Sequence, residues 1–152
     1  MRICVLAVGK LKERFWKDAC AEYMKRLSHV DIIEAADERG SDNNISRALV
    51  RESERILSYV KPHDYLAALC VNGAAFSSVE LASLIETNTS KGVSRMVFVI
   101  GGSHGLHKNV IDRAAIQVSF SQMTFPHQLM RVILLEQIYR AGKIIKKETY
   151  HK

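Results

Sequence analysis

Hydrophobic and polar positions fall into two kinds of block along this chain. Short runs of apolar, β-branched residues end at turn-forming residues, a pattern typical of buried strands. We predict five strands, over residues 2–8, 30–35, 64–73, 95–102 and 116–120. The third of them ends at Asn72 and Gly73, a pair that favours a turn.

Longer segments between the strands repeat apolar residues every three or four positions, as an amphipathic helix does. They predict helices over residues 11–27, 45–60, 78–88, 106–115 and 126–145. Ser77 or Ser78 is the expected N-cap of the third helix, and Glu80 lies in its first turn. Thr124 is the expected N-cap of the last helix, because a first turn tolerates Pro126.

The order of these elements predicts the fold class. Strands that alternate with helices favour an α/β fold, in which helices cover both faces of a parallel sheet. The polar stretch 37–44 predicts a mobile loop. With 152 residues the chain is expected to form one domain with a substantial core.

Composition narrows the class of protein. The chain is 47% hydrophobic and 25% charged, as in ordinary globular proteins, and no apolar run reaches membrane-spanning length. The charged start lacks a cleavage site for a signal peptide, so a cytoplasmic protein is expected. Cys4, Cys20 and Cys70 match no zinc spacing and no disulfide framework, and they are interpreted as small buried residues. No metal is expected.

The net charge of +6 is concentrated at the two ends of the chain. Residues 140–152 carry five lysines and arginines against one acid, and residues 1–27 carry seven against three. Such a distribution favours an anionic partner, although many basic proteins bind none.

Three segments that follow strands have unusual composition: 69–73, 101–106 and 119–125. In α/β sheets, ligands bind beyond the carboxyl ends of the strands. We therefore expect these segments to build one pocket if the fold brings the strands together.

The segment "VIGGSHG" places three glycines within five residues after a strand. It is either a loop whose peptide groups line a ligand, with Gly101 leaving an approach path, or a tight turn into the next helix. It lacks the spacing of a dinucleotide fingerprint and the Gly-Lys-Ser/Thr of a Walker loop.

The segment "SFSQMTF" combines Phe120, Met123 and Phe125 with small polar residues. Residues of this kind are usually part of the core. The alternative is that they form the walls of a slot for a flat, partly apolar ligand such as adenine.

The last predicted helix is apolar around nearly its whole circumference, which indicates burial on more than one side. One side is expected to meet a second subunit in a twofold dimer. A structural pairing of Arg131 with Glu136 or a carboxyl-terminal group is favoured over a catalytic role. Tyr150 and His151 in the basic tail are either frayed, or stack on a base and handle a proton.

Taken together, these segments resemble the SPOUT-class RNA methyltransferases of bacteria, and within them the ribosomal RNA large subunit methyltransferase H family. The similarity covers essentially the whole chain. It lies in "AVGKLKERFWKDACAEYMKRL", in "VFVIGGSHGLHKNV", and most specifically in "SFSQMTFPHQLMRVILLEQIYRA" and the closing "YHK".

The resemblance implies an α/β fold with a carboxyl-terminal trefoil knot and a homodimer that binds S-adenosylmethionine at the subunit interface. It implies methylation of N3 of a pseudouridine in the large-subunit ribosomal RNA of assembled ribosomes. By matching position, the cofactor contacts would be Leu69, Gly101, Phe120, Ser121, Gln122, Met123, Thr124 and Phe125.

Catalysis in that family requires mainly that two reactants be aligned and that the imide proton be lost. The candidates for substrate positioning and proton handling are Arg140, Tyr150 and His151, which the short tail would present to the partner's cofactor. The basic amino-terminal helix and tail would bind phosphates of the RNA.

Two other functions stay open from the sequence. Ala74 and Gly142 depart from the family pattern of a lysine and a bulky residue, which leaves room for an RNA-binding module without turnover. A small-molecule enzyme that uses another nucleotide also fits the strand-end loops, but it does not explain the basic tail.

Overall fold

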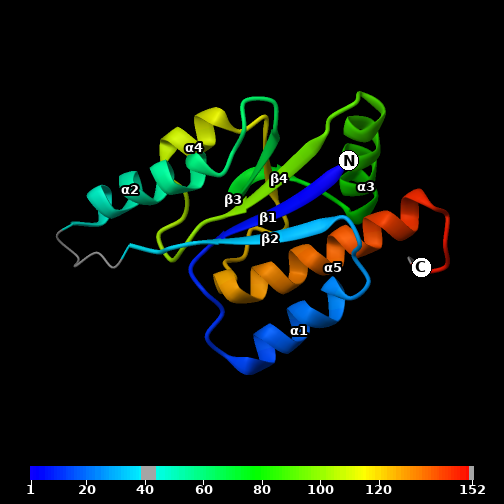
Figure 1. Ribbon diagram of the computed structural model, residues 1–152, viewed down its shortest axis with the longest axis horizontal. Coiled ribbons are helices and arrows are strands. Elements are labelled where there is room, and N and C mark those ends of the chain that lie inside the picture. Colours follow the sequence, from blue (N-terminus) through cyan, green and yellow to red (C-terminus); the bar gives the residue numbers. More distant parts are fainter. Residues whose placement is uncertain (39–43, 151–152) are drawn as a thin grey trace.

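The computed structural model describes residues 1–38 and 44–150, which form alternating strands and helices (Figure 1). The predicted mobile loop 37–44 lies largely outside the described residues. The strands are β1 (Arg2–Val8), β2 (Val30–Ala35), β3 (Tyr65–Ala75), β4 (Arg95–Ile100) and β5 (Ile116–Ser119). The helices are α1 (Arg14–Met24), α2 (Ile45–Ser58), α3 (Ser78–Ser90), α4 (Lys108–Arg113) and α5 (His127–Ile145).

The strands form a single sheet in the order β2-β1-β4-β3-β5, and every neighbouring pair is parallel. The predicted parallel α/β fold is therefore confirmed. This order makes β3, β4 and β5 neighbours, so their carboxyl ends lie along one stretch of the sheet edge. The chain threading that the resemblance implies stays a prediction.

The sheet is buried on both faces, which explains why its strands are continuous apolar runs. Ile3, Val5 and Phe98 point to the side covered by α1, α3 and α5, whereas Leu6 and Val97 point to the side of α2 and α4. Figure 1 shows the same three layers, with α2 and α4 on one side of the strands. None of the helices in the described parts of the chain is long and apolar enough to cross a membrane.

Helix α1 is shorter than predicted because its expected first turn is used elsewhere. The backbone N–H of Leu11 donates to Glu34 Oε1 at 3.3 Å, and that of Lys12 donates to Gln128 Oε1 at 3.4 Å. Residues 9–13 therefore form the loop between β1 and α1, and its backbone is hydrogen-bonded to β2 and to the start of α5.

Helix α5 begins later than predicted, and Thr124 does not cap it. The N-cap is Pro126, whose carbonyl accepts from the N–H of Met130 at 3.0 Å, and no side chain caps this end. Thr124 is exposed two residues earlier. The proline carbonyl closes the first turn, and Thr124 remains in the preceding loop.

The predicted pairing of Arg131 with Glu136 is wrong, although its structural role is correct. Arg131 is 1% exposed, donates from Nη1 to Glu34 Oε1 at 2.5 Å, and donates from Nη2 to the Gly9 carbonyl at 2.9 Å. Residue 131 lies on the face of α5 that packs against the sheet, whereas Glu136 lies on another face and binds Arg140. A buried guanidinium thus joins α5 to β2 and to the end of β1.

The predicted cap of α3 is confirmed at Ser77. Its side chain accepts from the Glu80 N–H at 3.2 Å, and the Glu80 carboxylate accepts from the Ser77 N–H at 2.7 Å, which completes a capping box. These hydrogen bonds with Ser77 lower the pKa of Glu80.

We expect the Ser77→Ala substitution to lower the free energy of unfolding by about 1 kcal/mol, because one N–H of the first turn loses its acceptor. Chemical denaturation measures this change. Ser83→Ala, at an exposed serine within the same helix, is the control and should cause no loss.

The Glu80 side of the capping box should make stability depend on pH. Because the pKa of Glu80 is lowered in the folded protein, the carboxylate stabilises the fold fully above the ordinary glutamate pKa. That stabilisation disappears as the pH falls through the lowered value, so the difference between wild type and Glu80→Gln should shrink on acidification.

Candidate active site

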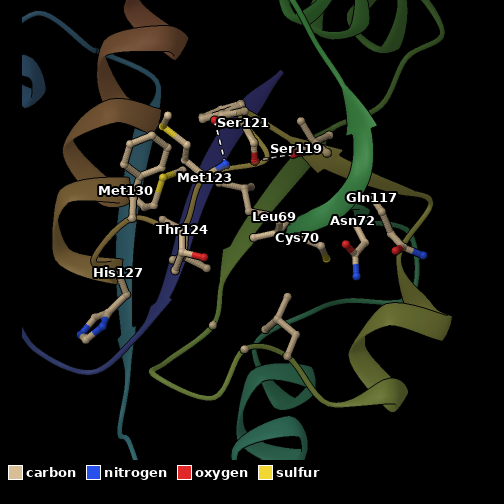
Figure 2. Close-up of a pocket in the computed structure, with 18 of the residues that line it drawn as sticks. Leu69, Cys70, Asn72, Gln117, Ser119, Ser121, Met123, Thr124, His127 and Met130 are labelled. Carbon is tan, nitrogen blue, oxygen red and sulfur yellow. Dashed lines mark hydrogen bonds between the residues drawn. The ribbon is translucent and has the colours of Figure 1, made fainter.

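A cavity of about 860 Å³ lies at the carboxyl ends of β3, β4 and β5. Its walls come from all three strand-end segments singled out in the sequence, 69–73, 101–106 and 119–125 (Figure 2). The volume falls in the upper part of the range for small-molecule sites. The prediction that these segments build one pocket is confirmed.

The wall contributed by β3 is a bulge, and the predicted turn at Asn72 and Gly73 is wrong. Strand β3 pairs with β5 up to Leu69, and the pairing resumes at Ala74 with a register shift. The intervening residues Cys70, Val71 and Asn72 line the cavity. A side chain at Gly73 would meet the backbone of Gln117 at 2.8 Å, so the glycine allows the two strands to stay close. Bulges are common beside active sites because they redirect side chains.

The glycine segment after β4 folds back on itself. The N–H of Gly105 donates to the Gly102 carbonyl at 3.1 Å, and Gly105 has a φ of +78°. A Cβ at Gly101 would lie 2.5 Å from the Gly105 carbonyl oxygen. Gly101 lines the cavity as expected, but the expected reason, that a ligand approaches where the side chain is missing, is wrong. The missing side chain makes room for the loop's own backbone, and the folded loop then lines the cavity.

The segment after β5 forms the third wall and is held by its own polar groups. Ser119 Oγ donates to the Ser121 carbonyl at 3.0 Å, and the Met123 N–H donates to Ser121 Oγ at 3.0 Å. Met123 is 72% exposed, and Phe120 and Phe125 are only half-buried. Their placement at the cavity favours the slot over the core, although Phe120 also packs against the core.

The predicted cofactor contacts are brought together with one exception. The cavity is lined by Leu69, Gly101, Phe120, Ser121, Met123, Thr124 and Phe125, whereas Gln122 is exposed and does not line it. Sequence reasoning missed Ile111, Gln117 and Met130, which also line the cavity. These three lie inside regular elements, where a residue's pattern gives no sign that its side chain meets a cavity.

The cavity has an apolar end and a polar end. Figure 2 shows the sulfur atoms of Met123 and Met130 close together on one side, and the amides of Asn72 and Gln117 on the other. Cys70 lies at the polar end, and burial raises the pKa of its thiol. The thiol is therefore neutral at pH 7. A cysteine nucleophile reacts as the thiolate, so Cys70 is not suited to that role. This arrangement suits a ligand with an apolar portion and a polar edge.

The predicted catalytic residues do not line this cavity. Arg140 lies on α5 ten residues after Met130, a separation of about 15 Å along a helix. Tyr150 packs beside it, with the Arg140 Cζ 4.8 Å from the centroid of the phenol ring. In Figure 1 the tail lies at the opposite end of α5 from the segment that enters the cavity. His151 lies outside the described residues.

Glu136 holds Arg140 and Tyr150 together. Its Oε1 accepts from Arg140 Nη2 at 2.6 Å and from the Tyr150 hydroxyl at 3.3 Å. The hydrogen bond with Glu136 raises the pKa of Arg140, so the guanidinium stays charged. Desolvation, and then the charge of Glu136, raise the pKa of Tyr150, so its phenol stays protonated. At neutral pH the group is therefore a cation and a protonated phenol, both bound to the Glu136 carboxylate.

The two basic segments of the sequence meet in space. Helices α1 and α5 run side by side, from the Lys12–Gln128 hydrogen bond at one end to a 6.4 Å contact between the Tyr23 and Tyr139 rings at the other. Arg26, two residues after the end of α1, and Lys143 from α5 both lie over the Tyr139 ring, at 5.8 and 5.4 Å from its centroid. Cations from both ends of the chain thus surround one aromatic cluster.

Comparison with known proteins places the chain in a family. Residues 1–151 match the family described as predicted SPOUT methyltransferases. The fold resembles a probable methylase family protein from Haemophilus influenzae Rd KW20, with a TM-score of 0.60, 10% identity, and coverage of 99% of this chain and 70% of that one. It also resembles a probable methyltransferase from Bordetella pertussis Tohama I, with a TM-score of 0.59, 13% identity, and coverage of 92% and 95%.

A putative methylase family protein from Neisseria gonorrhoeae is similar as well, with a TM-score of 0.60, 9% identity, and coverage of 99% and 86%. At such low identities these structures show a shared fold, and the family match covers nearly the whole chain. The protein belongs to the SPOUT methyltransferase family.

We expect Gly101→Ala to lower the free energy of unfolding by about 1–3 kcal/mol, because the added methyl group overlaps the Gly105 carbonyl. Gly142→Ala is the matched control. Nothing lies within 4 Å of a Cβ there, and removing a helical glycine should stabilise the protein by up to about 1 kcal/mol. Thermal or chemical unfolding measures both changes. Equal stability of the two variants would contradict the packing described for the loop.

Proposed function

We propose that this protein is an S-adenosylmethionine-dependent methyltransferase that acts on N3 of a pseudouridine in large-subunit ribosomal RNA. The observation that carries the proposal is the pocket itself. Three strand-end segments, which correspond to the cofactor-binding positions implied by the sequence resemblance, enclose one cavity in a member of the SPOUT methyltransferase family.

The chemistry of the cavity fits this methyl donor. Phe120, Met123 and Phe125 line the cavity, and aromatic and thioether side chains of this kind are suited to a flat base. The peptide groups of segment 119–125 that are not used within the segment itself would read the polar edge of that base. The opposite polar end, with Asn72 and Gln117, is suited to the charged groups of an amino acid. When bound, S-adenosylmethionine would supply an electrophilic methyl group.

The chain's own residues account for the remaining requirements. Methyl transfer to a ring nitrogen needs alignment of the acceptor and stabilisation of the anion that forms when the imide proton leaves. Arg140 supplies a permanent positive charge for that anion. Tyr150 stays protonated, so its role is to position the substrate by hydrogen bonding or stacking, and proton removal falls to another group. His151 is the candidate for that step.

A homodimer reconciles the cavity with the distant tail. Arg140 and Tyr150 are too far along α5 to reach the cavity of their own chain, so the proposed site takes its cavity from one protomer and its tail from the other. The outward face of α5 supports this arrangement, since Leu129 and Ile133 on it are apolar. Two such helices packed about a twofold axis would bury these side chains.

Binding of ribosomal RNA is supported by the basic residues that α1 and α5 bring together. Arg26 and Lys143 lie over the Tyr139 ring, and Lys25 is next to Arg26 in the sequence. These cations would contact RNA phosphates, which carry no sequence information. Affinity for RNA should therefore fall steeply with salt. An RNA-binding module without turnover would share this surface but would have no use for a donor-sized cavity.

The test compares ribosomal RNA nucleosides, by mass spectrometry, from cells with and without the gene. We expect one methylated pseudouridine to disappear from large-subunit RNA when the gene is deleted and to return when it is restored. Calorimetric titration of the purified protein with S-adenosylmethionine separates an enzyme from a binding module. An unchanged nucleoside profile together with no donor binding would exclude the proposed activity.

A complementation experiment tests the shared site. Gly101→Ala should displace the glycine loop that lines the cavity, so that the variant protomer no longer binds the donor. Arg140→Ala should remove the cation that the tail contributes. When the two chains are mixed and allowed to exchange, half of the dimers are mixed and each contains one intact site. We therefore expect recovery of about a quarter of wild-type methylation. Each variant alone should stay inactive, and no recovery in a verified mixed dimer would mean that each protomer acts alone.

A further inference from the structure

The end of α5 contains the least usual backbone conformation in the described parts of the chain. Lys147 has a φ of +55° and is the only residue there, apart from glycines, with a positive φ. Residues other than glycine and asparagine adopt this left-handed conformation at an energetic cost. Interactions made by the residues after Lys147 must therefore favour this conformation.

The conformation of Lys147 closes a turn that reverses the chain. The Glu148 N–H donates to the Lys143 carbonyl at 2.9 Å, and the Lys147 N–H donates to the Ile144 carbonyl at 3.0 Å. This pair of bonds is the Schellman arrangement, in which the left-handed position usually holds glycine. An ion pair between the Lys143 and Glu148 side chains spans the same turn.

The reversal decides where Tyr150 lies. If α5 continued as a helix, residue 150 would be about 15 Å beyond Arg140 along the axis. Instead the Tyr150 ring packs edge-on against Tyr139, with centroids 4.9 Å apart and planes at 82°. The Arg140 guanidinium covers the Tyr150 ring, and Glu136 accepts from its hydroxyl. Tyr150 is thus packed against α5 of its own chain.

We propose that Lys147 is a positioning residue for RNA methylation. Its left-handed turn folds the tail back, so that Arg140 and Tyr150 form one preassembled unit bound to Glu136 before the second protomer or the RNA is met. This inference rests on the proposed function, because it assigns the unit to the substrate side of the methyltransferase site. Tyr150 is then ordered when the protein folds, so the free energy of RNA binding is not spent on ordering it.

Substitutions at residue 147 separate the turn from the charge. Lys147→Gly, Lys147→Asn and Lys147→Val all remove the lysine charge, but only glycine and asparagine adopt a positive φ readily. Lys146→Val is the matched control, because the neighbouring residue has an ordinary φ of −82° and also carries a lysine. The measurements are kcat and KM for RNA methylation, and the affinity for S-adenosylmethionine.

We expect Lys147→Val to lower kcat about tenfold or more, which corresponds to the cost of the left-handed conformation for a β-branched residue. Lys147→Gly, Lys147→Asn and Lys146→Val should keep kcat within about twofold. All four should keep the wild-type affinity for the donor, since the turn is distant from the cavity. Any common rise in KM for RNA would report the lost charge alone.

A second readout follows the tail without activity. Protein labelled with 3-fluorotyrosine gives one fluorine signal for each tyrosine, and Tyr150→Phe identifies the signal of residue 150. We expect that signal to coincide in wild type, Lys147→Gly and Lys147→Asn, and to move towards the free amino acid in Lys147→Val. A merely structural role for Lys147 in overall stability would not move this signal selectively.

Three results would overturn the inference: a normal kcat for Lys147→Val, an equal fall in kcat for all three variants at residue 147, or a fall without movement of the Tyr150 signal. If wild-type protein binds S-adenosylmethionine but methylates no ribosomal RNA, the proposed function fails and the positioning role fails with it. The fluorine spectra would then still report whether Lys147 orders the tail, so the two failures are distinguishable.

Discussion

The buried guanidinium of Arg131 is the contact on which the position of α5 depends. It joins the helix to Glu34 of β2 and to the Gly9 carbonyl after β1, with 1% of the residue exposed. Its Nε is buried and has no hydrogen-bond partner among the described residues, so the pair is held at some cost in solvation. Removing the partner of such a buried charge strongly destabilises the protein. A shift of α5 along the sheet would separate Arg131 from Glu34, so the pair favours one register of the helix.

That register matters because one helix serves two tasks. The first turn of α5 brings His127 and Met130 to the cavity, and its last turns carry Arg140 and the tail. A rigid helix keeps these two regions apart within a chain, which is the reason for proposing that the cavity of one protomer is completed by the tail of another. The same helix pairs with α1, so the cations of both chain ends gather beside the tail. The position of α5 therefore fixes the cavity, the tail and the basic residues relative to one another.

Much of this arrangement could be predicted locally. The strands are apolar runs bounded by turn formers, and the cap at Ser77 follows from a serine three residues before a glutamate. The three cavity segments were recognisable because each is unusual in composition and follows a strand. The errors share a different cause. The Thr124 cap, the Asn72–Gly73 turn and the Arg131–Glu136 pair are local interpretations of residues whose partners come from distant segments.

The sequence by itself determined the alternation of strands and helices, the parallel sheet and the concentration of positive charge at both ends, because these depend on periodicity and composition. Only the tertiary structure decided that β3 continues through a bulge, because the pairing partner β5 lies more than forty residues later. It likewise decided that Gly101 accommodates the Gly105 carbonyl and that Lys147 turns the tail back onto Glu136. Such features depend on distances between atoms that the linear order of residues does not fix.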